Sequence, residues 1–195
     1  MPIFHPVDPL GESFPHVLDA AREGSGWAFE QLFRSLAVPV VGYLRAQGLA
    51  DPDGGVNEVF LRVFRSLGTF DGSEDKFRSW VFTIAHHLVV DERRARSRRP
   101  VTTELSEADA SHPAGDAEED AHQLLSDARV MGLLDQLPPL QRDVILLRVV
   151  ADLSIEHVAE SVGRRPGAVK ALQRRGLAAL RRLLERESVA RGVSP

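Results

Sequence analysis

Positive charge is concentrated near the C-terminal end of the chain. From Arg164 to Arg186 the sequence holds eight cations against one acid. Guanidinium and ammonium groups are the usual partners of phosphate, so this stretch is suited to bind a phosphate backbone. The alternative is a charged helix face that only keeps the helix in contact with water. Because nearly all the charges have the same sign, a nucleic-acid-binding surface is favoured. The cations are Arg164, Arg165, Lys170, Arg174, Arg175, Arg181, Arg182 and Arg186.

A second run of arginines, in the middle of the chain, has the same chemistry. Arg93, Arg94, Arg96, Arg98 and Arg99 lie within seven residues at the end of an expected helix. Such a run is suited to hold DNA phosphates, which adds affinity but no sequence preference. The alternatives are a solvated basic run or a localisation-like signal. Because the run continues directly from a patterned helix, the phosphate role is favoured.

Two short helices joined by a tight turn position the C-terminal cations. Ser154 is a good N-cap for the first helix, Gly163 suits the left-handed residue that ends it, and Pro166 fits the first turn of the next. Both helices carry an apolar stripe that can pack inward. This pattern is typical of a helix-turn-helix. The stripes comprise Ile155, Val158, Ala159 and Val162, then Val169, Leu172, Gly176, Leu180 and Leu183.

The N-terminal half also has helical periodicity. Apolar residues from Val56 to Leu67 and from Phe77 to Leu88 recur at the spacing of amphipathic helices, and the loop between them is rich in Gly and Asp. Further helices are expected from about Phe14 and from Trp27 to Gln47, where Pro39 is a possible bend. Strand-like alternation of useful length is missing, which favours an all-helical domain.

Charge is segregated along the chain. Its net charge is −4, but residues 100–128 hold eight acids and no Lys or Arg, so the remainder carries +4. We therefore expect an all-α fold of two small helical domains, residues 14–99 and 121–187, joined by a flexible acidic linker at 100–120. A leader at 1–13 and a tail at 188–195 complete the predicted organisation.

Composition excludes several classes of protein. The chain has no cysteine, so it has no disulfide framework, thiolate metal site or thiol nucleophile. It lacks a signal-like N-terminus and a long apolar run, which predicts a cytoplasmic protein without membrane insertion. An enzyme is the rival from another class. In the cluster His86, His87 and Asp91, His87 and Asp91 are four residues apart on one expected helix and could share a metal, but two ligands make no closed site. We expect no catalytic residues, no metal and no cofactor.

Taken in order, these features resemble a sigma factor of the extracytoplasmic-function (ECF) type, a short RNA polymerase specificity subunit of the sigma-70 family. The likeness covers roughly residues 29–99 and 137–184. The stretches FRSWVFTIAHHLVVDERRARSRR and LPPLQRDVILLRVVADLSIEHVAESVGRRPGAVKALQRRGLAALRRL are similar to the second and fourth regions of that family, and DPDGGVNEVFLRVFRSL is a weaker match within its second region.

The resemblance implies that the chain binds core RNA polymerase, directs it to promoters and initiates transcription. Exposed positions of the helix at 56–67 would contact polymerase, namely Asn57, Glu58, Arg62 and Arg65. The minus-ten element would be bound by Phe70, Asp71, Lys76, Arg78, Trp80 and His87 together with the arginine run. The minus-thirty-five element would be read in the major groove by Arg165, Lys170, Ala171, Gln173, Arg174 and Arg175, with Arg164 nearer the DNA backbone.

The chain departs from the family pattern at several positions. Gly54 and Gly55 stand where an acid and an apolar residue are usual, Asn57 replaces glutamine and His87 replaces asparagine. The loop from Phe70 to Phe77 is one residue longer than usual. Leu172 and Arg174 differ from the common residues of the recognition helix, so the promoter preference of relatives does not transfer.

Other functions fit parts of the same pattern. A two-domain helix-turn-helix regulator that is not a polymerase subunit is the nearest rival, and it would need a receiver or ligand pocket in its first half. A pure interaction module that holds an anti-sigma protein is the third. An anti-sigma factor is in any case a partner that the resemblance implies.

Overall fold

The computed structural model describes residues 9–98 and 128–190, and within these ranges every regular element is helical. The expected acidic linker lies outside the described residues. In the N-terminal half, a short 3-10 helix (Gly11–Ser13) precedes α1 (Phe14–Arg22), α2 (Gly26–Ala46) and α3 (Pro52–Ser66). A second 3-10 helix (Leu67–Thr69) leads to α4 (Glu74–Arg98).

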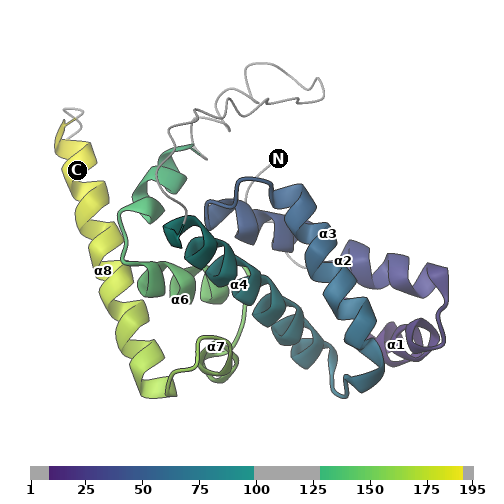
Figure 1. Cartoon of the computed structure of the whole chain (residues 1–195). Helices are drawn as coiled ribbons and strands as arrows, with labels where there is room; N and C mark the ends of the chain where they lie inside the picture. The colour runs from purple at the N-terminus through teal and green to yellow at the C-terminus, as the bar shows by residue number, and fades with distance from the viewer. Residues whose placement is uncertain (1–8, 99–127, 191–195) are drawn as a thin grey trace.

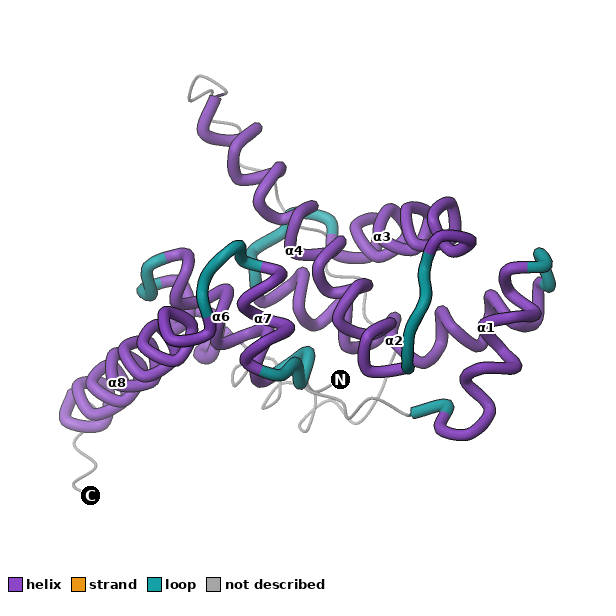
Figure 2. Tube along the Cα trace, turned by 90° about the horizontal axis from the view of Figure 1, so that it is seen from below, coloured by secondary structure: helices purple, strands orange, loops and turns teal. Residues whose placement is uncertain are grey.

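The C-terminal half begins with helical residues 128–135 and continues through α6 (Pro139–Val149), α7 (Ile155–Ser161) and α8 (Pro166–Ala190). Both views place α8 and α1 at opposite ends of the molecule (Figures 1 and 2). Helix α4 lies between them and contacts α2 and α3 on one side and α7 on the other. The all-α fold with two helical halves is therefore confirmed.

Packed aromatic and aliphatic side chains form the core of the N-terminal half. Tyr43, Phe60 and Phe82 are at most 2% exposed, and the apolar stripes of α3 and α4 face each other as their spacing predicts. At the start of α4, the Glu74 carboxylate accepts hydrogen bonds from the backbone of Leu10 and Gly11 at 2.7 and 2.9 Å. Leu10 and Gly11, which belong to the predicted leader at 1–13, are thus hydrogen-bonded to α4.

The helix-turn-helix forms as predicted. The Ser154 hydroxyl accepts a hydrogen bond from the backbone N–H of His157 at 3.1 Å, which caps α7. Gly163 ends the helix with a φ of +62°. Val169 in α8 is fully buried. Helix α8 continues to Ala190, past the expected domain boundary at residue 187.

Among the described residues, no helix combines the length and the apolar character that a membrane crossing requires.

Candidate nucleic-acid interface

The cations of the helix-turn-helix lie on the outer side of α8. Arg164 and Arg165 precede this helix, and Lys170, Arg174 and Arg175 lie in its first half; all five are exposed. Ala171 and Gln173 are half-buried. Arg175 donates only to the carbonyl of Ala171 in its own helix, at 3.3 Å, so its charge is not used by an acid in this arrangement. The predicted groove-reading residues therefore lie on α8, apart from Arg165 just before it. They are accessible, with Ala171 and Gln173 partly buried.

The loop before α4 is folded against aromatic side chains. The Phe70 ring stacks on Trp80, with centroids 5.0 Å apart and an angle of 18°, and meets Phe77 edge-on at 5.4 Å. Phe77 is 1% exposed and Trp80 half-buried, so Phe77 is a core residue and one face of Trp80 is covered by Phe70. Asp71 and Lys76 beside them are exposed.

Arg78 differs from its neighbours because its side chain is only 13% exposed. Its Nε is buried and has no hydrogen-bond partner among the described residues, and Asp75 lies 3.9 Å from its guanidinium. A buried guanidinium nitrogen without a partner is costly. It is therefore a donor that an incoming polar group would satisfy. His87, which lies further along α4 and is predicted for the same task, is exposed.

The arginine run at the end of α4 divides in two. Arg94, Arg96 and Arg98 are exposed, whereas Arg93 points into the junction of the two halves. Arg94 has Asp91 at 3.8 Å in its own helix, and Arg96 reaches the carbonyl of Gly48 only at 3.5 Å. Arg99 lies outside the described residues.

On α3 the predicted polymerase-contacting residues share the side that faces away from the core. Asn57 and Arg65 are exposed, and Glu58 accepts a hydrogen bond from Arg62 at 2.7 Å across one helical turn. The packing also explains the departure at Gly55. A Cβ there would lie 2.5 Å from Leu49 Cδ2 and 2.9 Å from Leu44 Cδ1, so a side chain at this position requires both leucines to move.

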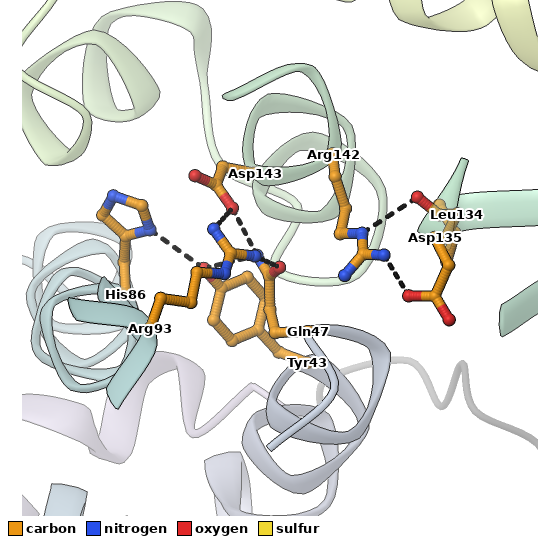
Figure 3. A network of polar contacts seen from close by, with 8 residues as sticks. All are labelled: Tyr43, Gln47, His86, Arg93, Leu134, Asp135, Arg142 and Asp143. Carbon is orange, nitrogen blue, oxygen red and sulfur yellow. Dashed lines mark hydrogen bonds and ion pairs between the residues drawn. The ribbon is translucent and has the colours of Figure 1, made fainter. Parts of the chain in front are cut away.

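A buried polar network at the junction was missed by the sequence reasoning (Figure 3). Gln47, just after α2, donates to the Tyr43 hydroxyl and to Asp143 Oδ1 of α6, both at 3.0 Å. Arg93 donates to Asp143 Oδ1 at 2.9 Å and to Gln47 Oε1 at 2.5 Å. Tyr43, Gln47 and Asp143 are at most 4% exposed. Beside them, Arg142 pairs with Asp135 and with the carbonyl of Leu134.

His86 ends this network with a defined protonation state. Its Nδ1 lies 3.2 Å from the Tyr43 hydroxyl, whose oxygen already accepts from Gln47. Burial raises the pKa of Tyr43 far above its ordinary value, so the hydroxyl keeps its proton beside His86. Burial also lowers the pKa of His86 below the ordinary 6.5, helped by His87 and Arg93 and opposed by Asp143. His86 is thus neutral near pH 7.

A dependence of stability on pH follows. Between the lowered pKa of folded His86 and its unfolded value near 6.5, only the unfolded chain takes up the proton, so stability present above pH 6.5 is lost as the pH falls. A tenfold difference in proton affinity between the two states is worth about 1.4 kcal/mol. Urea unfolding at pH 8.0 and 5.5 measures the loss. We expect His86→Gln to reduce it and His87→Gln, at the exposed neighbour, to retain it; equal losses in both variants would contradict the assignment.

The structure places no further metal ligand beside His87 and Asp91 among the described residues. Among residues 9–98 and 128–190, no group of three or more His, Asp or Glu side chains is arranged to hold a metal ion. His86 is directed at Tyr43, while His87 and Asp91 are exposed.

The fold and these surfaces define a two-part helical protein with exposed cations in both halves. Residues 32–99 match the family model of sigma-70 region 2, and residues 127–180 match that of sigma-70 region 4. The chain belongs to the ECF sigma factors of the sigma-70 family. Since region 2 occupies the first half, the regulator alternative, which needs a receiver or ligand pocket there, is not favoured.

Sequence similarity to named ECF sigma factors extends over most of the chain. It is 33% identical to the ECF RNA polymerase sigma factor BldN of Streptomyces coelicolor, over 86% of this chain and 64% of that protein. It is also 33% identical to the ECF sigma factor SigD of Mycobacterium tuberculosis, over 88% of this chain and 84% of SigD. A solved structure of CnrH in complex with the cytosolic domain of CnrY has a TM-score of 0.67 at 26% identity, covering 91% of this chain and all of that one.

Proposed function

We propose that this chain binds core RNA polymerase, directs it to promoters and initiates transcription, without a catalytic activity of its own. The observation that carries the proposal is the pairing of two family regions with two separate cationic surfaces, one on α4 and one on α8. A protein that works with polymerase and chromosomal DNA acts in the cytoplasm.

The exposed residues divide the task between the halves. The residues of α3 that face away from the core are assigned to polymerase, namely Asn57, Glu58, Arg62 and Arg65. The loop at 70–76 with Arg78, Trp80 and His87 is assigned to the minus-ten element, where a base leaves the stack at a cost of a few kcal/mol that pocket contacts offset. Because Phe70 lies on Trp80, a base that stacks on that face of Trp80 has to displace Phe70.

The first half of α8 is assigned to the minus-thirty-five element. Its accessible Arg174 and Arg175 are suited to bidentate contacts with guanine, and Gln173 to adenine. Arg164, before the helix start, is assigned mainly to phosphates, and Arg165 beside it to the groove together with Lys170. CnrH was solved with a protein partner; by analogy, an anti-sigma factor is the proposed regulatory partner of this chain.

Run-off transcription with core polymerase and a pool of genomic promoter fragments tests the proposal. We expect transcripts that depend on the added chain and that share two upstream elements. No transcripts above those of core polymerase alone, with any co-purified inhibitor removed, would refute the proposed function.

A prediction for the recognition helix separates base reading from phosphate binding. Arg174→Ala and Arg175→Ala are each expected to weaken binding to a selected promoter by about 1–3 kcal/mol where the arginine pairs bidentately with a base. Binding to a duplex with a scrambled minus-thirty-five element is the control. An equal loss on both duplexes would reassign that arginine to the phosphate backbone.

A further inference from the structure

The loop at 70–76, which is assigned to the minus-ten element, is held by a segment that lies far away in the sequence. Both oxygens of the Glu74 carboxylate accept a backbone N–H from that segment, Oε1 from Leu10 at 2.7 Å and Oε2 from Gly11 at 2.9 Å. Hydrogen bonds to a carboxylate are roughly twice as strong as those between neutral groups. The start of α4 is therefore fixed by residues 63 and 64 positions earlier.

The backbone at Leu10 and Gly11 is shaped to receive a carboxylate. Leu10 has right-handed helical dihedrals, with φ −72° and ψ −21°, and Gly11 has a φ of +58°. A right-handed residue followed by a left-handed one turns successive N–H groups toward one point, which forms a small anion-binding concavity. Glycine adopts the left-handed conformation without the penalty that a Cβ brings. Glu74 supplies the anion from within the same chain.

A second contact holds the other end of the same loop. The guanidinium of Arg22, at the end of α1, donates to the backbone carbonyl of Phe70. Its orientation is fixed by Asp19, which accepts from the same guanidinium at 2.8 Å. Residues 71–73 lie between the two anchored positions. The segment 10–22 thus fixes both ends of a three-residue stretch.

A loop that is fixed before DNA arrives lowers the cost of base capture. A free loop loses conformational entropy when it closes on a base, and this loss reduces the affinity for the correct base. A loop that is already ordered avoids that cost. A wrong base does not form the pocket contacts that close a free loop, so ordering the loop in advance favours the correct base. The two anchors are therefore expected to raise discrimination at the minus-ten element.

We propose that residues 10–22 form a brace that holds the loop at 70–76 in its base-capturing conformation. Glu74 and Arg22 are positioning residues, which act on DNA only through the loop. The proposal rests on the proposed function. It assigns a part in promoter selectivity to α1 and to residues of the predicted leader.

Run-off transcription with core polymerase tests the brace in the full-length chain, on a selected promoter and on its single-base variants. Glu74→Gln keeps the length of the side chain but replaces one acceptor oxygen by an NH₂ group, which cannot accept from a backbone N–H. Glu12→Gln is the matched control. It makes the same change of charge in the same segment, at an exposed residue outside the contact with Glu74.

Glu74→Gln is expected to reduce discrimination among minus-ten bases by at least about fivefold, the order of one lost hydrogen bond to a charged group, and discrimination at the minus-thirty-five element by less than about twofold. Glu12→Gln is expected to retain both. Unchanged discrimination at the minus-ten element, or an equal loss at both elements, would overturn the brace. No transcription by the unmodified chain would refute the proposed function instead.

A pair of glycine variants perturbs the brace from its other side. Gly11→Ala strains the left-handed backbone that presents the two N–H groups, although the added Cβ would have open space around it. Gly48→Ala, after α2, imposes the same kind of strain at a φ of +73°, also in open space. Only Gly11→Ala is expected to reduce minus-ten discrimination. An equal reduction in both variants would attribute the effect to general strain and overturn the brace.

The state of the loop is also measurable without polymerase or DNA. Phe70 covers one face of Trp80 in the braced loop. In a Trp27→Phe background Trp80 is the sole tryptophan, and quenching of its fluorescence by acrylamide reports access to that face. Glu74→Gln is expected to increase the quenching, and Glu12→Gln to leave it unchanged. Equal quenching in the two variants would overturn the brace whatever the outcome of transcription.

Discussion

Truncation of Phe60 to alanine is expected to cost about 3–5 kcal/mol of folding free energy, as is typical for a large aromatic removed from a packed core. Phe60 is 2% exposed on the inner side of α3. Its ring lies 4.8 Å from that of Phe33 and 5.7 Å from that of Phe64, so its removal leaves a cavity that neighbouring rings cannot fill without leaving their own contacts. Denaturant unfolding followed by circular dichroism measures the loss.

Leu61 offers a matched control on the same helix. It is the next residue along α3 and is 44% exposed, so Leu61→Ala is expected to change the unfolding free energy by no more than about 0.5 kcal/mol. Similar losses at both positions would contradict the orientation of α3. Since that orientation also presents Asn57 and Arg65 to solvent, such a result would remove the structural basis for the polymerase surface.

Local signals explain why the helix-turn-helix could be predicted from the sequence. A cap at Ser154, a left-handed residue at Gly163 and a proline at the start of α8 each act within one turn of the backbone, and the structure has all three where they were expected. The amphipathic stripes of α3 and α4 were predictable for a similar reason, since helical periodicity alone places their apolar residues on one side.

The junction could not be predicted because its partners are distant in the sequence. Gln47 and Asp143 are 96 residues apart, and Arg93 and Asp143 are 50 apart. In the sequence each is an ordinary polar residue, and only the packing of α2, α4 and α6 buries them together. Arg93 was consequently grouped with its exposed neighbours. Gly55 is a similar case, since its lack of a side chain matters only through the approach of α3 to α2.

The second large effect is expected at Gly176, where α8 crosses α6. A Cβ at this position would lie 2.5 Å from Ile145 Cδ1 and 3.4 Å from Gln141 Cβ. In Gly176→Leu, the Cβ alone requires the end of the Ile145 side chain to move, and the rest of the leucine side chain overpacks the crossing and is expected to displace α8. Overpacking of this kind costs about 1–3 kcal/mol. Because α8 carries Arg174 and Arg175 on its other side, the displacement is also expected to weaken binding to a minus-thirty-five duplex.

The variant Gly167→Leu is the control for this packing effect, because it adds the same side chain to α8 at a position where no other helix is close. Gly167 lies in the same helix, and a Cβ there would have no heavy atom within 4 Å apart from its local backbone. Leucine has the better helix propensity by about 0.8 kcal/mol, so Gly167→Leu is expected to leave stability unchanged or raise it. Urea unfolding of the two variants decides the matter. If Gly176→Leu proves as stable as Gly167→Leu, α8 does not pack on α6 at this distance, and the position of the recognition helix must be set by other contacts.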